Sequence, residues 1–252
     1  MISFNNLFFL LLVLSGCNGA IDIQKYLKVC NRNALDANDC MVDAVQKGIA
    51  AMIDGIPDLD VPQIDPYLQK YFKLDYNNNQ LAVKLVMKNT YVTGLKNSIV
   101  KDARLRADDD KFHLEVDLTT PKVTITTNYR GEGKFNVLNI YAYGTINTTM
   151  TDLTYTWKLD GVPEKKGNDT YVRITEFYMR PDVGSMFTAL ENENLESREL
   201  TDLGVSFANA NWRTLYKEFL PFAQENWNKI GTAIANKVFS KVPYDELFPA
   251  SS

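Results

Sequence analysis

The sequence predicts an α+β domain in which a long C-terminal helix is wrapped by a strongly curved antiparallel β-sheet. Through the middle of the chain, apolar residues recur with a period of two, which is typical of strands with one buried face. Over residues 212–238 they recur with a helical period for about seven turns. So long a helix requires a long, curved sheet to cover it, and the two enclose an elongated apolar interior.

Residues 1–20 are predicted to be a signal peptide. An apolar run at 7–14 is followed by small or polar residues at 15–20, and this run is shorter than the roughly 20 residues needed to cross a bilayer. The alternative is a buried N-terminal helix. Cleavage after Gly19 or Ala20 leaves one secreted, extracellular domain at 21–252 with no membrane anchor.

Two of the three cysteines remain after this cleavage, Cys30 and Cys40. An even pair in an oxidising compartment is expected to form a disulfide, and closing this short loop is worth about 3 kcal/mol. Metal ligation is the rival interpretation, but two thiolates and the single histidine of the chain make a poor zinc set.

Two N-glycosylation sequons agree with a secreted protein, at Asn147 and Asn168. Each is followed at the second position by threonine, and neither has proline between. We expect the mature protein to be a glycoprotein.

Composition excludes a nucleic-acid binder. Charged residues make up 23% of the chain and the formal net charge is -4, so the chain lacks a basic footprint. Apolar residues make up 45%, which is sufficient for a core. No cofactor-binding motif occurs, and without a heptad seam we expect a monomer.

The remaining elements are predicted from periodicity and turn chemistry. Helices are expected at 21–27 and 39–53, and the glycine and prolines at 55–62 end the second one. A meander is the simplest topology for the strands that follow. The strands are expected at 81–87, 98–106, 113–118, 122–130, 135–147, 150–159, 171–179, 184–190 and 203–207, with turns at 108–110, 130–133 and 160–163.

The C-terminal helix divides into an apolar and a polar side when residues are placed at 100° steps. Pro221 falls in the middle of the polar side, where water satisfies the carbonyl group that it leaves free, so we expect a bend there that is convex toward solvent. The apolar arc therefore curves around the interior. It comprises Trp212, Leu215, Tyr216, Phe219, Leu220, Phe222, Ala223, Trp227, Ile230, Ala233, Ile234 and Val238.

Short motifs in a fixed order along nearly the whole chain resemble those of the takeout and juvenile hormone-binding protein family of secreted insect carriers. The most specific is Pro-Tyr-Asp-Glu-Leu-Phe-Pro at 243–249. The others are Cys30 with Cys40, Asp54-Gly55-Ile56-Pro57, Tyr129 with Gly131 and Gly133, and Asn211-Trp212. The hormone-binding branch usually carries a second disulfide, but no cysteine follows Cys40, so the takeout-like branch is favoured.

The resemblance implies an elongated hydrophobic tunnel and a haemolymph carrier of a small terpenoid, quinone-like or fatty ligand. The C-terminal helix is then expected to line the tunnel, and tyrosine hydroxyl groups are candidate polar contacts. Any receptor is unknown. The candidate ligand-binding residues are Trp212, Leu215, Phe219, Phe222, Ala223, Trp227, Ile230, Ile234, Tyr141 and Tyr143.

Three other functions are alternatives to a carrier. An extracellular interaction or signalling protein would fill the same interior with its own side chains and bind no ligand. An enzyme is disfavoured because His113, the only histidine, lies in an alternating strand without a recognisable partner, so no catalytic residue and no metal site is expected. A membrane-surface helix is disfavoured because the polar side of the last helix mixes acidic with basic residues.

Overall fold

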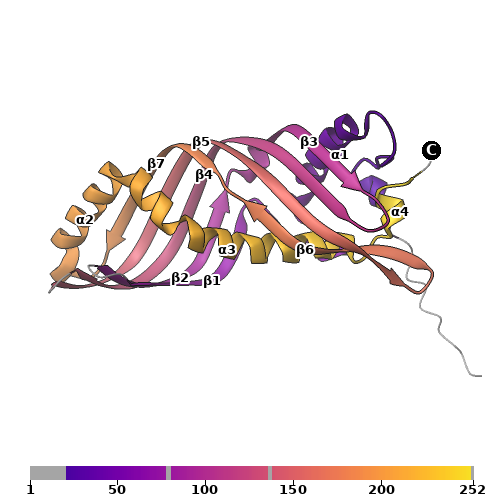
Figure 1. Ribbon diagram of the computed structural model, residues 1–252. Coiled ribbons are helices and arrows are strands. Elements are labelled where there is room, and N and C mark those ends of the chain that lie inside the picture. Colours follow the sequence, from indigo (N-terminus) through magenta and orange to yellow (C-terminus); the bar gives the residue numbers. More distant parts are fainter. Residues whose placement is uncertain (1–20, 78–80, 136–137, 251–252) are drawn as a thin grey trace, which may run out of the picture.

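The computed structural model describes residues 21–77, 81–135 and 138–250. The predicted signal peptide at 1–20 lies outside the described residues. The molecule is elongated, with a tilted, curved sheet, helix α1 at one end and helix α2 at the other (Figure 1).

All strand pairs of the sheet are antiparallel. Two long strands form its centre: β4 has 24 residues, β5 has 29, and they pair along nearly their whole length. Each has two further partners in succession on its other side, β3 and β2 for β4, and β7 and β6 for β5. The strands are β1 (Tyr67–Asn77), β2 (Leu81–Thr93), β3 (Ile99–Ala107), β4 (Phe112–Phe135), β5 (Leu138–Lys166), β6 (Asp169–Met179) and β7 (Asp182–Asn192).

A simple meander is therefore wrong, because β2 pairs with β4 and β5 with β7. The turns predicted at 130–133 and 160–163 are wrong as well, since both segments lie inside strands. In the second segment, Gly161 allows the neighbouring strand to pack closely, because a Cβ at this position would lie 2.8 Å from Cγ1 of Val172.

The inner face of the two long strands changes parity in the middle. Opposite each other, Pro121 and Asp152 have no partner in the β4–β5 register, and Asp152 has a positive φ of 54°. Before this point Leu118 and Thr120 are buried, and after it Val123 is buried. Such an irregularity bends a sheet while the apolar side chains stay on its inner face. Because the alternation of apolar residues shifts by one position here, the sequence predicts two short strands where β4 forms one long strand, and likewise for β5.

The helices lie at the ends and along the open side of the sheet (Figure 1). Helix α1 confirms the helix expected at 39–53, with nearly the same bounds. The helix expected at 21–27 is instead a single 3-10 turn. The helical segments are η1 (Ile23–Lys25), α1 (Ala37–Met52), η2 (Pro57–Leu59), η3 (Leu95–Asn97), η4 (Leu195–Ser197), α2 (Arg198–Ala210), α3 (Trp212–Phe239) and α4 (Tyr244–Leu247).

Two segments were assigned wrongly from the sequence. The strand expected at 203–207 is part of α2, and its short run of alternating residues is compatible with either structure. Strand β1 was not expected, because its apolar residues do not alternate regularly.

Helix α3 lies along the open side of the sheet and forms hydrogen bonds to two of its edge strands, β6 and β1. On β6, Asn236 accepts from the amide of Ile174 (2.9 Å) and donates to its carbonyl oxygen (2.8 Å), as a neighbouring strand would. On β1, Gln69 and Asn226 exchange two amide hydrogen bonds of 2.9 and 3.2 Å. Pro221 lies inside the helix and is exposed, as its place on the polar side predicted.

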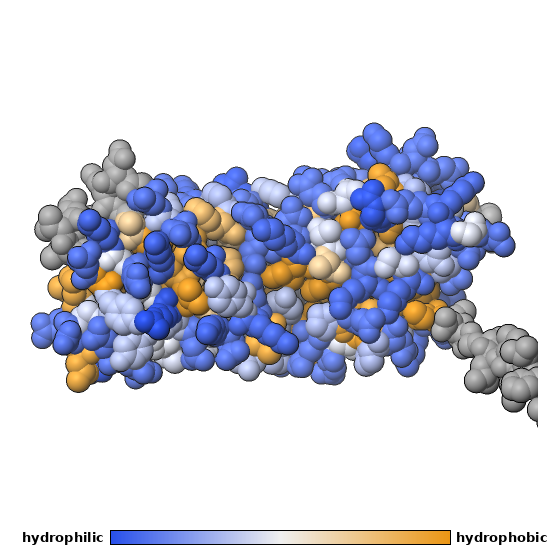
Figure 2. Space-filling model, turned by 90° about the horizontal axis from the view of Figure 1, so that it is seen from below, coloured by the Kyte–Doolittle hydropathy of each residue, from blue (hydrophilic) through white to orange (hydrophobic). Residues whose placement is uncertain are grey.

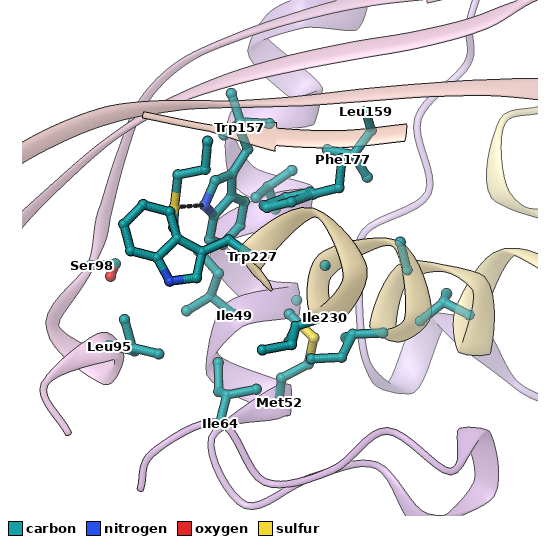
Figure 3. Close-up of a pocket in the computed structure, with 18 of the residues that line it drawn as sticks. Ile49, Met52, Ile64, Leu95, Ser98, Trp157, Leu159, Phe177, Trp227 and Ile230 are labelled. Carbon is teal, nitrogen blue, oxygen red and sulfur yellow. Dashed lines mark hydrogen bonds between the residues drawn. The ribbon is translucent and has the colours of Figure 1, made fainter. Parts of the chain in front are cut away.

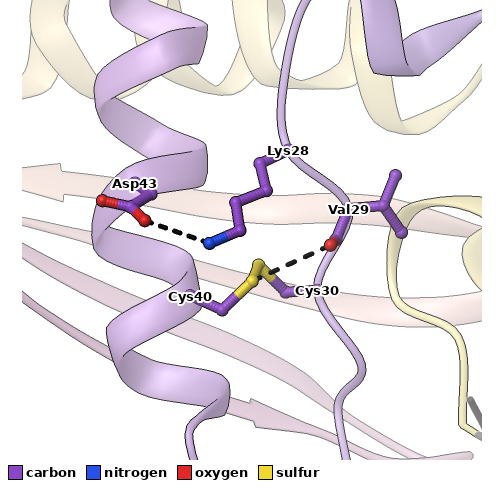
Figure 4. Close-up of a disulfide and its surroundings, with 5 residues drawn as sticks. All are labelled: Lys28, Val29, Cys30, Cys40 and Asp43. Carbon is purple, nitrogen blue, oxygen red and sulfur yellow. Dashed lines mark hydrogen bonds and ion pairs between the residues drawn. A yellow bond between two sulfur atoms is a disulfide. The ribbon is translucent and has the colours of Figure 1, made fainter.

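Cys30 and Cys40 form the expected disulfide, which ties the N-terminal segment to the first turn of α1 (Figure 4). Lys28 and Asp43 form an ion pair of 3.0 Å beside it. The pairing confirms the disulfide over the metal interpretation.

Candidate functional site

An apolar cavity of about 400 Å³ lies between the second half of α3, helix α1 and the inner face of the sheet. Figure 3 shows side chains from all three converging on it. From α1 come Met41, Ala44, Val45, Gly48, Ile49 and Met52. From α3 come Tyr216, Trp227, Ile230, Gly231, Ile234, Ala235, Val238 and Phe239. Strands β4, β5 and β6 supply Leu114, Val116, Val123, Ile125, Met150, Leu153, Tyr155, Trp157, Leu159, Phe177 and Met179.

Three of the predicted ligand-binding residues, Trp227, Ile230 and Ile234, lie together in this wall. They share one face of α3 because their spacings of three and four residues bring side chains onto one side of a helix. Trp227 and Ile230 project from α3 toward the sheet and α1 (Figure 3).

The opposite wall is aromatic. The rings of Trp157 and Phe177 lie 6.2 Å apart, and the indole Nε1 of Trp157 donates to Sδ of Met179 at 3.3 Å. Because the one polar atom of Trp157 is already paired within the wall, the surface that it presents to the cavity is apolar.

A cluster of three buried hydroxyl groups supplies the main polar feature. Thr120 lies 2.8 Å from both Ser98 and Tyr155, and Ser98 lies 3.3 Å from Tyr155. Ser98 and Tyr155 also line the cavity. Three donors in a closed triangle satisfy one another, while each oxygen keeps a lone pair, so the cluster can accept a hydrogen bond from a guest molecule.

Apart from Tyr216, the side chains of the first half of α3 do not line this cavity. Phe219 and Phe222 pack edge-on against the ring of Tyr76, with centroids 5.4 and 6.1 Å apart. Leu215 and Ala223 are half-buried and are not part of the cavity wall. Trp212 lines a separate groove.

Tyr141 and Tyr143 lie on the outer face of β5. Ala142 between them is buried, and its partner Gly131 shares the inner face with the buried Tyr129. Tyr143 is 38% exposed, and the guanidinium of Arg130 stacks on the ring of Tyr141 at 5.1 Å. Their expected place at the ligand is therefore wrong, because strand parity puts their side chains outside.

The polar clusters outside the cavity are ionic networks on the outer face of β3, β4 and β5. His113 lies 2.7 Å from Asp160 and 3.5 Å from Glu115. Lys158 and Arg104 also pair with Glu115, and they lower the pKa of its carboxyl to about 2. Within the described ranges, no three His, Cys, Asp or Glu side chains are grouped to hold a metal ion.

Asn147 and Asn168, the predicted glycosylation sites, are both exposed. Asn147 lies on the outer face of β5, and Asn168 lies in the turn between β5 and β6. Among the helices in the described part of the chain, none is both long enough and apolar enough to cross a membrane.

Comparison with known proteins identifies relatives along almost the whole chain. The family model described as haemolymph juvenile hormone binding protein matches residues 8–249. The circadian clock-controlled protein daywake is 24% identical over 233 residues in Drosophila yakuba, covering 90% of each chain, and 24% identical over 228 residues in Drosophila melanogaster, covering 88% of this chain and 86% of that one. The crystal structure of Epiphyas postvittana Takeout 1 matches with a TM-score of 0.68 at 22% identity, covering 88% of this chain and 99% of that chain, which shows a shared fold.

Proposed function

Because the chain belongs to the haemolymph juvenile hormone binding protein family, we propose that it is a secreted carrier that holds a small lipophilic ligand between α3 and the sheet. The observation that carries the proposal is the cavity of about 400 Å³ with its almost entirely apolar wall. Such a cavity favours an apolar molecule over water, because its wall offers water few hydrogen bonds.

Desolvation supplies the binding free energy. Burying ~300 Å² of apolar ligand surface at about 25 cal/mol per Å² contributes roughly 7 kcal/mol before ordering costs. A free energy of this size corresponds to a dissociation constant of roughly 10 μM, and each further 1.4 kcal/mol from a longer ligand or a hydrogen bond would lower that constant about tenfold.

The hydroxyl cluster defines the chemical class further. Ser98 and Tyr155 offer lone pairs at one place in an otherwise apolar wall. A mainly hydrocarbon ligand that carries a hydroxyl group, such as a terpenoid or a fatty alcohol, can donate to these lone pairs. A quinone-like molecule has only carbonyl acceptors, so a hydroxyl group of the cluster would have to turn and donate to it. No cysteine follows Cys40, which supports a place in the takeout-like branch.

Filling the cavity from α1 tests the proposal. Gly48 lines the cavity, and a Cβ added there would meet no atom within 4 Å, so Gly48→Leu places a side chain in open space. We expect the variant to fold and to lose binding of a fluorescent apolar probe such as phenylnaphthylamine. Titration of the probe measures the dissociation constant, and circular dichroism checks the fold.

Gly204→Leu is the matched control. Gly204 also lies in a helix and also has no atom within 4 Å of an added Cβ, but it lies on α2 away from the cavity. This variant is expected to bind the probe as the wild type does. A folded Gly48→Leu protein with wild-type affinity would show that the ligand does not bind in this cavity.

A further inference from the structure

A second depression lies outside the cavity, where the connection from β6 to β7 meets the first turns of α3. Its volume is about 490 Å³. We call it the basic groove. It is lined by Arg180, Pro181, Asp182, Val183, Trp212, Arg213, Tyr216, Lys217 and Leu220.

The basic groove is positively charged on a negatively charged protein. Three cations, Arg180, Arg213 and Lys217, face one anion, Asp182, whereas the whole chain has a formal net charge of -4. Within the part of the chain that the structure describes, the side chains of Arg180 and Lys217 form no ion pair and no hydrogen bond. Their charges are therefore available to an anion from outside.

Arg213 is held in place by its neighbours. Its guanidinium donates to the carbonyl oxygen of Gly184 at 2.9 Å and lies 4.3 Å from the ring of Trp212. The groove thus combines one cation held by its neighbours, two exposed cations and an aromatic surface, a combination that suits a carboxylate joined to an apolar chain.

Only a thin wall separates the basic groove from the apolar cavity, because Pro181 and Tyr216 line both. The hydroxyl of Tyr216 donates to the carbonyl oxygen of Pro181 at 2.8 Å. Burial raises the pKa of Tyr216 to about 12, so this donor stays protonated in neutral solution. A hydrocarbon chain that extends from one space into the other would therefore pass between these two residues.

We propose that the basic groove binds the carboxylate of a fatty acid whose hydrocarbon chain passes Tyr216 into the apolar cavity. This inference rests on the proposed carrier function and names its ligand class. The groove supplies charge at the surface, and the cavity supplies the apolar surface that buries the chain.

The test compares palmitic acid with cetyl alcohol, which has the same chain length and no charge. We expect the wild-type protein to bind the acid about tenfold more tightly at low ionic strength, with an advantage that shrinks as salt is added. Arg180→Gln combined with Lys217→Gln should remove the advantage and leave the affinity for the alcohol unchanged. Displacement of a fluorescent probe measures both affinities.

The control is Lys165→Gln combined with Lys229→Gln, which removes the same charge from exposed positions outside the groove. It should keep the preference for the acid. A preference that survives in the groove variant, or equal binding of both lipids by the wild type, would overturn the inference while the carrier function stands. A wild-type protein that binds neither lipid would overturn the carrier function, and this inference with it.

Discussion

Arg32 links the N-terminal segment to the C-terminal end of the domain. Its side chain is only 8% exposed, and it donates to Asp245 and to the carbonyl oxygen of Phe248, both at 2.7 Å. Its guanidinium also lies 4.7 Å from the ring of Tyr244. These contacts hold α4, the centre of the family-like motif at 243–249, against the segment that carries the disulfide.

Replacing Arg32 with methionine keeps most of the side-chain volume and removes the hydrogen bonds. We expect the free energy of unfolding to fall by about 2 kcal/mol, because the carbonyl of Phe248 loses its charged partner in a partly buried place. Urea denaturation of the oxidised protein measures the change. Arg106→Met is the control: Arg106 is exposed, and a loss as large as that of Arg32→Met would contradict the argument.

The residues of the cavity were predictable only in part. Periodicity placed Trp227, Ile230 and Ile234 on the apolar side of the helix, but it placed Phe219 and Phe222 there equally. Their different surroundings depend on Tyr76, which lies far away in the sequence. The contribution of α1 was missed, although its apolar residues Met41, Val45 and Ile49 follow a helical spacing that signals one buried face.

At the scale of elements, the approach of α3 to β6 depends on Gly231. A Cβ at this position would overlap the ring of Phe177. Asn236 and Asn228 bond to the backbone of β6 on either side of this contact. The glycine therefore lets the helix lie close enough to the strand for its asparagine side chains to reach the edge.

Gly231→Ala should destabilise the fold by about 1–2 kcal/mol, although alanine favours helix by up to ~1 kcal/mol over glycine. Gly204→Ala on α2 has open space around it, so there the helix preference should appear alone and raise the melting temperature. Thermal unfolding of both variants measures the difference. If both variants were stabilised alike, the close packing of Gly231 on Phe177 would be refuted.

Helix α3 was predicted within one residue of its C-terminal bound because its period holds for many turns. The strands were predicted less well, since glycine in 130–133 and 160–163 is typical of turns, whereas here both segments lie inside strands and Gly161 allows close contact with Val172 on the neighbouring strand. The register of β2 on β4 and of β7 on β5 has no local signal. Such long-range pairing depends on the whole sheet.

At the scale of the whole molecule, the sheet and α3 together with α1 surround the apolar cavity. The helix α3 reaches β6 through Asn236 and β1 through Asn226, so it connects edge strands on opposite sides of the sheet. Most of the surface seen in Figure 2 is hydrophilic, with apolar side chains in separate patches. The apolar cavity behind this surface is the feature that a carrier of lipophilic molecules requires.

The central claim is that a lipophilic ligand occupies the cavity between α3, α1 and the sheet. A crystal structure of the mature protein with a bromine-labelled long-chain alcohol tests it most directly, because anomalous scattering locates the bromine without reference to the ligand's conformation. We predict a bromine peak inside the wall formed by Ile49, Trp157 and Trp227. Bromine peaks found only on the outer surface, beside an interior filled by side chains, would contradict the carrier and favour a protein that acts through its surface.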